Sequence, residues 1–345
     1  MTLPVTVIVP HFRADVLTEC LRSVYAHPPL PARVLVIDDG GNAPSLQRAQ
    51  AEVPQFEVLR NDRNLGFSGS CNRGLEATRT PYAVLLNDDT RVTAGWLQPL
   101  LQAAAGDGMV AACQPKLRSA VEPDRFDYGG GAGGYIDRLG FTFCRGRLFD
   151  HREVDDGQYD RSVPLFWACG SALFLQMAAA RRVGLLDLDY YMHFEEIDLC
   201  WRLQLAGYRI LAVPASLVYH HSGYSLPPQS FRKAYLNHRN NLVMLCKNSA
   251  AARLWWLLPL RVALDLLATA AYVGQRQWTS IPAPAAATLW LVTHPRQLWR
   301  RRRRSRSTGV AGARCAGVYA GCLPVQYYLR GIRRARDLRP AIDPP

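Results

Sequence analysis

Two adjacent carboxylates, Asp88 and Asp89, directly follow an unbroken apolar run in the segment YAVLLNDDT at residues 82–90. An apolar run without polar alternation is typical of a strand buried on both faces. Acids at its end would lie at the carboxyl edge of a sheet, where open α/β folds bind ligands. Because two carboxylates cannot be buried there without compensation, a divalent cation is a natural partner. Alternatively, the acids cap a following helix, since Thr90 and Thr93 come next.

A second acidic cluster, Glu195, Glu196 and Asp198, lies in the first turn of a helix expected over residues 195–206. The aromatic segment YYMHF precedes it, and a carboxylate beside aromatic rings has the raised pKa that suits a general base. Acids at a helix start also complement the helix dipole without any chemical role. Asp198 can in addition orient Arg202 one turn later. The cluster therefore predicts either a general base or a dipole-stabilised helix start.

A glycine-rich turn and a histidine accompany the two acidic clusters. The turn NLGFSGS at residues 64–70 leads into a helix, where backbone amides suit phosphate oxygens. It matches neither the Walker pattern nor GxGxxG, so the standard nucleotide fingerprints are absent. His220 ends an expected strand and could add a ligand to a cation held by the acidic pair. The alternative is a structural histidine.

Alternating strands and helices must position these residues. Strands are expected at residues 5–9, 34–37, 56–59, 82–86, 166–175 and 210–213 and just before His220, and helices at 15–25, 45–51 and 71–78. Apolar strands that alternate with helices indicate βαβ units and a parallel sheet, hence an α/β fold. Residues 126–159, rich in glycine, aromatic residues and arginine, predict an ordered loop with short strands over the sheet edge, and not a linker.

Charge is distributed unevenly along the 345 residues. The net charge is +13, but residues 232–345 hold 20 Lys and Arg against 3 Asp and Glu, which gives +17. The first 231 residues carry −4. This asymmetry predicts an acidic body and a basic appendage that meets a polyanion, either a membrane surface or nucleic acid.

Cysteine usage and the first residues bear on the compartment. The nine cysteines are odd in number and form no CxxC pair, which favours reduced cysteines in a cytosolic protein. The first residues enter a strand pattern without a basic segment or a cleavage site, so no signal peptide is expected.

The basic appendage contains an apolar stretch at residues 254–273 that is about long enough to span a bilayer. Because Pro259, Arg261 and Asp265 interrupt it, we expect an amphipathic helix in the interface, with both charges facing lipid headgroups. Tryptophans suit that level and arginines suit anionic lipid: Trp255, Trp256, Trp278, Trp290, Trp299, Arg300 to Arg304 and Arg306. The alternatives are a helical subdomain with a solvated arginine face, or nucleic-acid binding, for which no recognised module is present.

The order of motifs over residues 5–248 is specific. The motifs are VTVIVPHF, VLVIDDG, RNLGFSGSCNRGL, YAVLLNDDT, FWACGSALF, MHFEEIDLCWRLQLAGYRI, VYHHSG and YLNHRNNLVMLCKN. This ordered set resembles family 2 glycosyltransferases of the GT-A fold, and is most similar to bacterial rhamnosyltransferase-like enzymes that build surface polysaccharide such as lipopolysaccharide. The resemblance implies a Rossmann-like, mostly parallel sheet flanked by helices. It places the nucleotide-sugar-binding catalytic domain at residues 1–230 and a membrane-associating helical region at 231–345.

The resemblance also implies roles for single residues. Asp89 takes the metal position of the family's DxD motif, His220 is the late metal-binding histidine, and the cation is Mn²⁺ or Mg²⁺. Glu196 takes the position of the catalytic base, with Glu195 just before it. Arg13 stands where asparagine is common in the family. The expected substrate-binding residues are Pro10, His11, Phe12, Asp38, Asp39, Asn64, Gly66, Asn72, Asp88, Trp167, Gly170, Ser171 and Asp198, of which Pro10 to Phe12 and Asp38 bracket the nucleobase and ribose.

The expected function is therefore an inverting, metal-dependent transfer of a sugar from a nucleotide-diphosphate sugar to a hydroxyl of a lipid-linked glycan. The expected location is cytoplasmic, on the inner face of the cell membrane as a peripheral protein, with no nucleic-acid partner. One alternative is a non-catalytic sugar-nucleotide-binding or scaffold protein of the same fold. Another is a sugar-phosphate nucleotidyltransferase, although such enzymes normally carry a glycine-rich basic loop where this chain has PHFRAD. The sequence does not specify the sugar, the nucleotide, the acceptor, the linkage or the oligomeric state.

Overall fold

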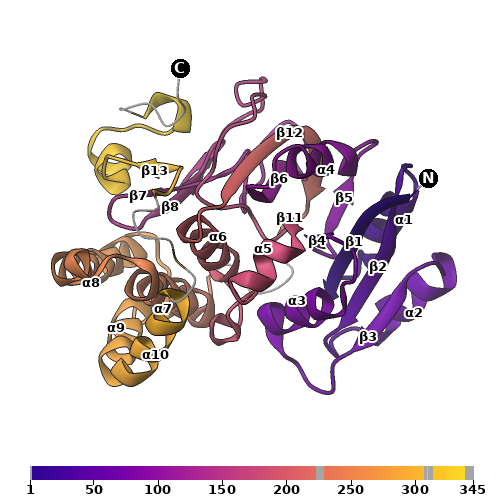
Figure 1. Ribbon diagram of the computed structural model, residues 1–345. Helices are drawn as coiled ribbons and strands as arrows, with labels where there is room; N and C mark the ends of the chain where they lie inside the picture. The colour runs from indigo at the N-terminus through magenta and orange to yellow at the C-terminus, as the bar shows by residue number, and fades with distance from the viewer. Residues whose placement is uncertain (1, 223–228, 307–308, 310–313, 339–345) are drawn as a thin grey trace.

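An eight-stranded mixed sheet forms the centre of the computed structural model, which describes residues 2–222, 229–306, 309 and 314–338. The strand order is β3-β2-β1-β4-β11-β6-β12-β5 (Figure 1). The strands have these bounds: β1 Thr2–His11, β2 Leu30–Asp38, β3 Glu57–Arg60, β4 Tyr82–Leu86, β5 Thr90–Val92, β6 Val110–Ser119, β11 Ala172–Gln176 and β12 Arg209–His220. Strands β1 to β4 are parallel, whereas β11 runs antiparallel to both β4 and β6. The predicted α/β fold is confirmed.

Helices connect the strands of this body and cover the sheet. Their bounds are α1 Leu17–Tyr25, α2 Ala43–Glu52, α3 Gly66–Ala77, α4 Leu97–Ala105, α5 Met177–Arg182 and α6 Glu195–Leu205. Helix α1 buries Leu17, Leu21 and Val24, which recur at helical spacing. Helix α3 lies so close to β1 that a Cβ on Gly74 would come within 2.3 Å of Ile8 Cγ2. A glycine is therefore required at this contact.

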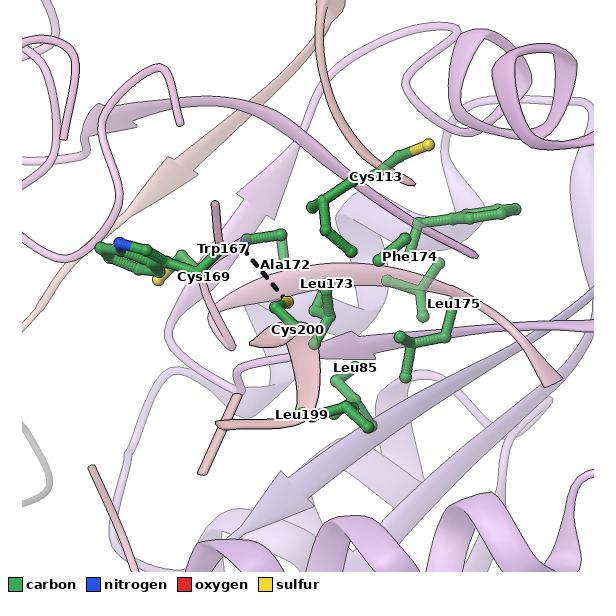
Figure 2. Packing of buried hydrophobic residues seen from close by; sticks show 14 of the residues in the cluster. Leu85, Cys113, Trp167, Cys169, Ala172, Leu173, Phe174, Leu175, Leu199 and Cys200 are labelled. Carbon is green, nitrogen blue, oxygen red and sulfur yellow. Dashed lines mark hydrogen bonds between the residues drawn. The ribbon is translucent and has the colours of Figure 1, made fainter. Parts of the chain in front are cut away.

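The main core lies where β4, β6 and β11 meet α6. Leu85, Cys113, Leu173 and Leu199 contribute one fully buried side chain from each of these elements. Figure 2 shows side chains from these four elements gathered in the core. Seven of the nine cysteines are buried and all nine are free, as expected for reduced core cysteines.

Three elements differ from the predictions. The strands expected at residues 210–213 and just before His220 are one continuous strand, β12, whose pairing with β6 shifts register between Val213 and Leu217. In the segment 166–175, only the part from Ala172 onward joins the sheet as β11. Helix α3 begins at Gly66 and not at residue 71, so the glycine-rich turn is itself the first turn of the helix.

Residues 126–159 form an ordered region with short strands, as predicted. Together with β13 from the C-terminal part of the chain, these strands make a second sheet in the order β10-β9-β8-β7-β13. Its strands have these bounds: β7 Gly134–Asp137, β8 Thr142–Cys144, β9 Arg147–Leu148, β10 His151–Arg152 and β13 Val318–Tyr319. Because β13 pairs with β7, the end of the chain returns to the body.

Four helices gather at one end of the molecule, in orange and gold in Figure 1. They are α7 Phe231–Asn248, α8 Ala251–Gly274, α9 Ala283–Thr293 and α10 Pro295–Arg306. Helix α7 is joined to α6 by a buried ion pair in which Lys247 Nζ lies 2.8 Å from Asp198 Oδ2. The division of the chain into domains at residue 230 stays a prediction.

The charged residues of α8 face the protein. Arg261 and Asp265 are both buried and form an ion pair of 3.1 Å, and His238 of α7 lies 3.4 Å from Asp265. The prediction that these charges face lipid headgroups is therefore wrong. The outward side of α8 is apolar and exposes Trp255, Trp256, Leu260, Leu266, Leu267 and Val273. Of the described residues, this helix alone is long and apolar enough to cross a membrane, by length and composition only.

Candidate active site

The carboxyl ends of β1, β2 and β4 meet at one edge of the sheet, because these strands are parallel and His11 is in register with Asp38. A first pocket of about 390 Å³ opens at this edge. That volume lies in the usual range of small-molecule sites. Of the predicted site residues, seven line it: Pro10, His11, Phe12, Asp39, Asn64, Gly66 and Asp88.

A second pocket of about 290 Å³ adjoins the first. Phe67, Asn87 and Met192 line both, so the two pockets meet at these side chains. Seven other predicted residues line the second pocket: Asp89, Trp167, Gly170, Ser171, Glu195, Glu196 and His220. The fold thus brings the predicted metal ligands and the predicted base, which are separated by up to 131 positions in sequence, to one cavity.

Asp89 and His220 face each other because β5 pairs antiparallel with β12 and places His220 opposite Thr90. His220 Nε2 lies 3.1 Å from Asp89 Oδ1, and His220 Nδ1 lies 3.1 Å from Asp127 Oδ2. Burial alone would lower the pKa of His220, but the carboxylates of Asp127 and Asp89 raise it well above its ordinary value. Ser222 holds Asp127 through a hydrogen bond of 2.9 Å.

The helix-cap interpretation of the acidic pair is wrong. Residues Thr90–Val92 form β5, and α4 begins only at Leu97, where Trp96 is the N-cap residue and no side chain caps the helix. Asp88 also points away from Asp89. Its Oδ2 atom lies 2.7 Å from His11 Nδ1 in the first pocket, and burial raises its pKa despite that contact. The two neighbouring carboxylates thus belong to different pockets.

Glu195 is buried and Glu196 is partly buried at the start of α6. Burial raises the pKa of Glu196 to about 6, although backbone hydrogen bonds, including one from Gly170, oppose the shift. Burial and the charge of Glu196 raise the pKa of Glu195 further, so Glu195 holds its proton more tightly. One oxygen on each carboxyl group, Oε2, is buried and has no hydrogen-bond partner among the described residues. Glu196 is therefore the member of the pair that can lose its proton near neutral pH.

The segment before α6 is held in a strained backbone conformation. Tyr191, His193 and Phe194 have φ angles of 65°, 68° and 73°, in the left-handed region that non-glycine residues rarely adopt. Asn240 of α7 donates hydrogen bonds from Nδ2 to the carbonyls of Met192 and His193, at 2.9 and 2.8 Å. Strain of this kind persists only where surrounding contacts fix it, and it is common at binding sites.

Sequence reasoning missed Asn240 and Asp127. Asn240 lies in the motif YLNHRNNLVMLCKN, to which no role was assigned. That motif could have indicated a functional residue at this position. Asp127 lies 93 positions from its partner His220, in a region without periodicity, and no local pattern marks it.

The glycine-rich turn is held by the protein itself. Asp39 accepts hydrogen bonds from the amides of Leu65 and Gly66, at 2.8 and 3.1 Å, and the amide of Ser68 donates to the carbonyl of Tyr191. Gly66 has a φ of 69° and would clash with the Tyr191 ring if it carried a Cβ. The amides of Gly66 and Ser68 thus have internal partners, while phosphate binding by the amides of residues 66–70 stays a prediction.

Three predicted substrate-binding residues lie outside both pockets. The Asn72 side chain exchanges two hydrogen bonds with the backbone of Leu186. Asp38 accepts a hydrogen bond from the amide of Gly40 and lies near Arg60. Asp198 is completely buried and bonds to four side chains: Tyr190, Arg202, Lys247 and Asn248. Burial would raise the pKa of Asp198, but Lys247 and Arg202 hold it below its ordinary value.

We expect Asp198→Asn to destabilise the fold by about 3–5 kcal/mol, because it leaves Lys247 and Arg202 buried without their counter-charge. Thermal and denaturant unfolding would measure this loss. Asp62→Asn, at an exposed position, is the matched control and should change stability by about 0.5 kcal/mol or less. An unchanged stability together with lost ligand binding would instead make Asp198 a substrate-binding residue.

Comparison with known proteins identifies two matching family profiles. "Glycosyl transferase family 2" matches residues 6–150, and "Glycosyl transferase family group 2" matches residues 82–298. The second match covers more than half of the chain. Both pockets lie largely within these ranges.

Curated relatives are similar over about two thirds of the chain. N-acetylglucosaminyl-diphospho-decaprenol L-rhamnosyltransferase of Mycobacterium tuberculosis is 26% identical over 255 residues, covering 68% of this chain and 80% of that protein. Pre-mycofactocin glycosyltransferase of the same species is 28% identical over 69% of this chain, which spans 49% of the relative. Rhamnosyltransferase WbbL of Escherichia coli is 41% identical over 69 residues, which cover 19% of this chain and 26% of that protein.

Among solved structures, GalNAc-T7 with UDP, GalNAc and Mn²⁺ superposes with a TM-score of 0.55 at 16% identity. The superposition covers 70% of this chain and 47% of that chain. At this identity the likeness shows the fold alone.

Proposed function

Because the chain belongs to glycosyltransferase family 2 and has the GT-A fold, we propose that it is an inverting, metal-dependent glycosyltransferase that transfers a sugar from a nucleotide-diphosphate donor to a lipid-linked glycan. The observation that carries this proposal is the second pocket. It is lined by Asp89, His220 and Glu196 and adjoins the first pocket at Asn87. One donor can therefore reach from the first pocket to both chemical groups of the second.

The first pocket suits the nucleoside half of the donor. Phe12 offers an aromatic surface, and the Arg13 guanidinium lies 4.9 Å from its ring centre. His11 and Asp88 supply polar groups at the pocket floor, and Arg232 lines the same pocket from α7. A donor bound here would extend its diphosphate past Asn87 toward Asp89.

The residues around Asp89 fit a divalent cation. Asp89 Oδ1 is buried and faces His220 Nε2 at 3.1 Å, so a cation bound here would take both atoms as ligands in place of their mutual contact. Asp127 holds His220 at Nδ1 and leaves Nε2 facing Asp89, which is how carboxylates orient metal-binding histidines. No group of three or more His, Cys, Asp and Glu side chains suited to a metal occurs in the described part of the chain. The remaining ligands would therefore be donor phosphate oxygens and water. A cation bound there would stabilise the negative charge on the leaving diphosphate.

Glu196 is proposed as the general base. The acceptor hydroxyl oxygen attacks the anomeric carbon, the bond from that carbon to the diphosphate oxygen breaks, and the hydroxyl proton passes to Glu196. Attack on the face opposite the leaving group inverts the configuration. With a pKa of about 6, Glu196 is ionised near neutral pH. Its Oε2 atom has no hydrogen-bond partner among the described residues and can accept the proton.

Two other functions remain as outcomes of the test. A scaffold protein has no need for two neighbouring acids with raised pKa values beside the pocket. A nucleotidyltransferase is disfavoured because PHFRAD follows β1 where a glycine-rich basic loop is usual.

Thermal unfolding with a panel of nucleotide-sugars, with and without Mn²⁺ or Mg²⁺, separates these possibilities. One nucleotide-sugar should raise the unfolding temperature, and more so with the metal. Protection by a nucleoside triphosphate and a sugar phosphate would favour the nucleotidyltransferase, and protection by a nucleotide-sugar without turnover would favour the scaffold.

The acceptor and the membrane are proposed together. The M. tuberculosis rhamnosyltransferase is named for a decaprenol-linked acceptor, and such lipids lie in membranes. Exposed apolar and basic side chains on the C-terminal helices would meet that surface: Trp255, Trp256, Trp278, Trp299, Arg300, Arg303, Arg304 and Arg306. Other members of the predicted set face the protein. Arg301 pairs with Asp189, Arg302 donates to the carbonyls of Cys246 and Ser249, and Trp290 lies under Arg239.

We expect the full-length protein to sediment with anionic vesicles, to lose much of that binding in high salt, and to be extracted by alkaline carbonate. Each arginine near an anionic surface contributes roughly 1 kcal/mol. Neutralising the four exposed arginines to glutamine should therefore weaken binding strongly. The matched control neutralises four exposed arginines of the body, namely Arg48, Arg63, Arg79 and Arg161. Equal effects of both sets would remove the appendage from the explanation, and resistance to carbonate would indicate a spanning α8.

A further inference from the structure

Two cationic side chains line the second pocket without a role in the chemistry proposed above. Arg147 belongs to β9, and Lys233 lies in the first turn of α7. Neither forms an ion pair with any carboxylate of the described residues. Arg147 donates to the carbonyl of Phe149 at 2.8 Å, and its Nη2 atom lies 3.7 Å from the Cys144 sulfur.

The described residues compensate these cations only in part. Burial would lower the pKa of Arg147, but Cys144, Tyr128 and the Asp127 carboxylate raise it. In the part of the chain that the structure describes, Arg147 Nε is buried and has no hydrogen-bond partner. Burial lowers the pKa of Lys233, which indicates that it has lost water without gaining a counter-charge. His193, in the same pocket, cannot serve as an anion, and burial together with Lys233 lowers its pKa to about 4. Partly buried cations of this kind are stabilised when a bound ligand brings further negative charge.

The anion that fits is a phosphate group. A guanidinium and an ammonium that converge on one pocket bind phosphate oxygens through charge-assisted hydrogen bonds. The Tyr128 ring lies 4.4 Å from the Arg147 guanidinium and helps to fix its direction. Tyr128 is 46% exposed, so this side of the pocket is accessible from solvent.

Because Arg147 and Lys233 share the second pocket with Asp89, the phosphate could come from the donor or from the acceptor. Tyr128, Thr142 and Arg147 come from the region of the small sheet, and none of them lines the first pocket. The first pocket has its own cations, Arg13 and Arg232, and the donor diphosphate is already assigned to the site at Asp89. Building on the proposed function, we propose that Arg147 and Lys233 bind the phosphate that joins the acceptor glycan to its lipid carrier.

The binding test uses farnesyl diphosphate, a prenyl diphosphate that carries no sugar. It is titrated by calorimetry into protein saturated with Mn²⁺ and with the nucleoside diphosphate that protects best against unfolding, so that the donor site is filled. Arg147→Met and Lys233→Met should each weaken its binding by about 10-fold or more, as expected for lost hydrogen bonds to a charged group. Arg161→Met, at an exposed position, is the charge-matched control and should leave binding unchanged. If neither pocket substitution weakens binding, the proposal is wrong.

Kinetics separate the two sources of phosphate. With an N-acetylglucosaminyl diphosphate on a short prenyl chain as acceptor, both variants should raise the KM for the acceptor by about 10-fold or more. The KM for the donor, and the rate with a neutral octyl N-acetylglucosaminide, should not change. A raised donor KM would assign the phosphate to the donor and overturn the proposal.

A substitute variant and one further outcome separate failure of the phosphate site from failure of the proposed glycosyl transfer. Should Arg147→Met fail to fold, Arg147→Lys, which keeps the charge and loses the planar fork, takes its place beside Lys233→Met. Absence of transfer to every acceptor, with farnesyl diphosphate binding still sensitive to both substitutions, would contradict the proposed glycosyl transfer and leave the phosphate site supported.

Discussion

Replacing Glu196 by glutamine is expected to lower the rate of sugar transfer by about 100-fold or more, with little change in donor binding. Glutamine has nearly the same shape as glutamate but cannot take the proton of the acceptor hydroxyl. Glu195→Gln is the matched control, because Glu195 is the neighbouring buried acid and holds its proton more tightly. It should do less harm to the chemical step, as measured by single-turnover rates with saturating donor. If the two effects are reversed, Glu195 is the base.

The pH dependence of the rate tests the same assignment. Burial raises the pKa of Glu196 to about 6, so below that pH the carboxyl is protonated and cannot act as a base. The rate should therefore fall as the pH drops through about 6 and level off above it. In Glu196→Gln this acidic limb should disappear from the residual rate. Persistence of the limb in that variant would assign it to another group.

Replacing Asp89 by alanine is expected to abolish the metal-dependent part of nucleotide binding. The carboxylate is proposed to hold the cation with His220, and removing it leaves one protein ligand. The fold should remain intact, because Asp89 lies in a turn after β4 and His220 keeps its contact with Asp127. Calorimetry with the nucleoside diphosphate, with and without Mn²⁺, measures the effect.

Asp88→Asn is the matched control for this measurement. Asp88 is the adjacent carboxylate, but it contacts His11 in the first pocket and not His220. This variant should keep the Mn²⁺ dependence of binding even if its overall affinity falls. An Asp89→Ala protein that retains metal-dependent affinity would contradict the assignment of the metal site.

The parallel half of the fold could be predicted from the sequence because its signals are local. Residues 83–86 are all apolar, which marks a strand buried on both faces, and Asp88 and Asp89 mark its end. Parallel pairing then places strand ends at one edge. The separation of the two acids into different pockets could not be predicted, because it depends on which partner, His11 or His220, each side chain meets across the sheet.

Polar residues outside the pockets show a second limit of predicting site residues from sequence. Asn72 and Asp198 lie within motifs that resemble a family, and a motif does not reveal whether a side chain faces a ligand or the protein. Both are buried and fully bonded to internal groups, as buried polar groups generally are. Likewise, the spacing of Arg261 and Asp265 permits an ion pair, but only the packing of α8 on His238 shows that the pair faces inward.

The central claim is that a sugar passes from a nucleotide donor to an acceptor hydroxyl at Glu196. Mass spectrometry of a prenyl-linked N-acetylglucosaminyl diphosphate, incubated with the protein, Mn²⁺ and each of a panel of nucleotide-sugars, tests it most directly. The account predicts a product heavier by one sugar residue, with release of a nucleoside diphosphate, and loss of that product in Glu196→Gln. Conversion of a nucleotide-sugar to a sugar phosphate and a nucleoside triphosphate in the presence of pyrophosphate, with no glycosylated product from any donor, would contradict it.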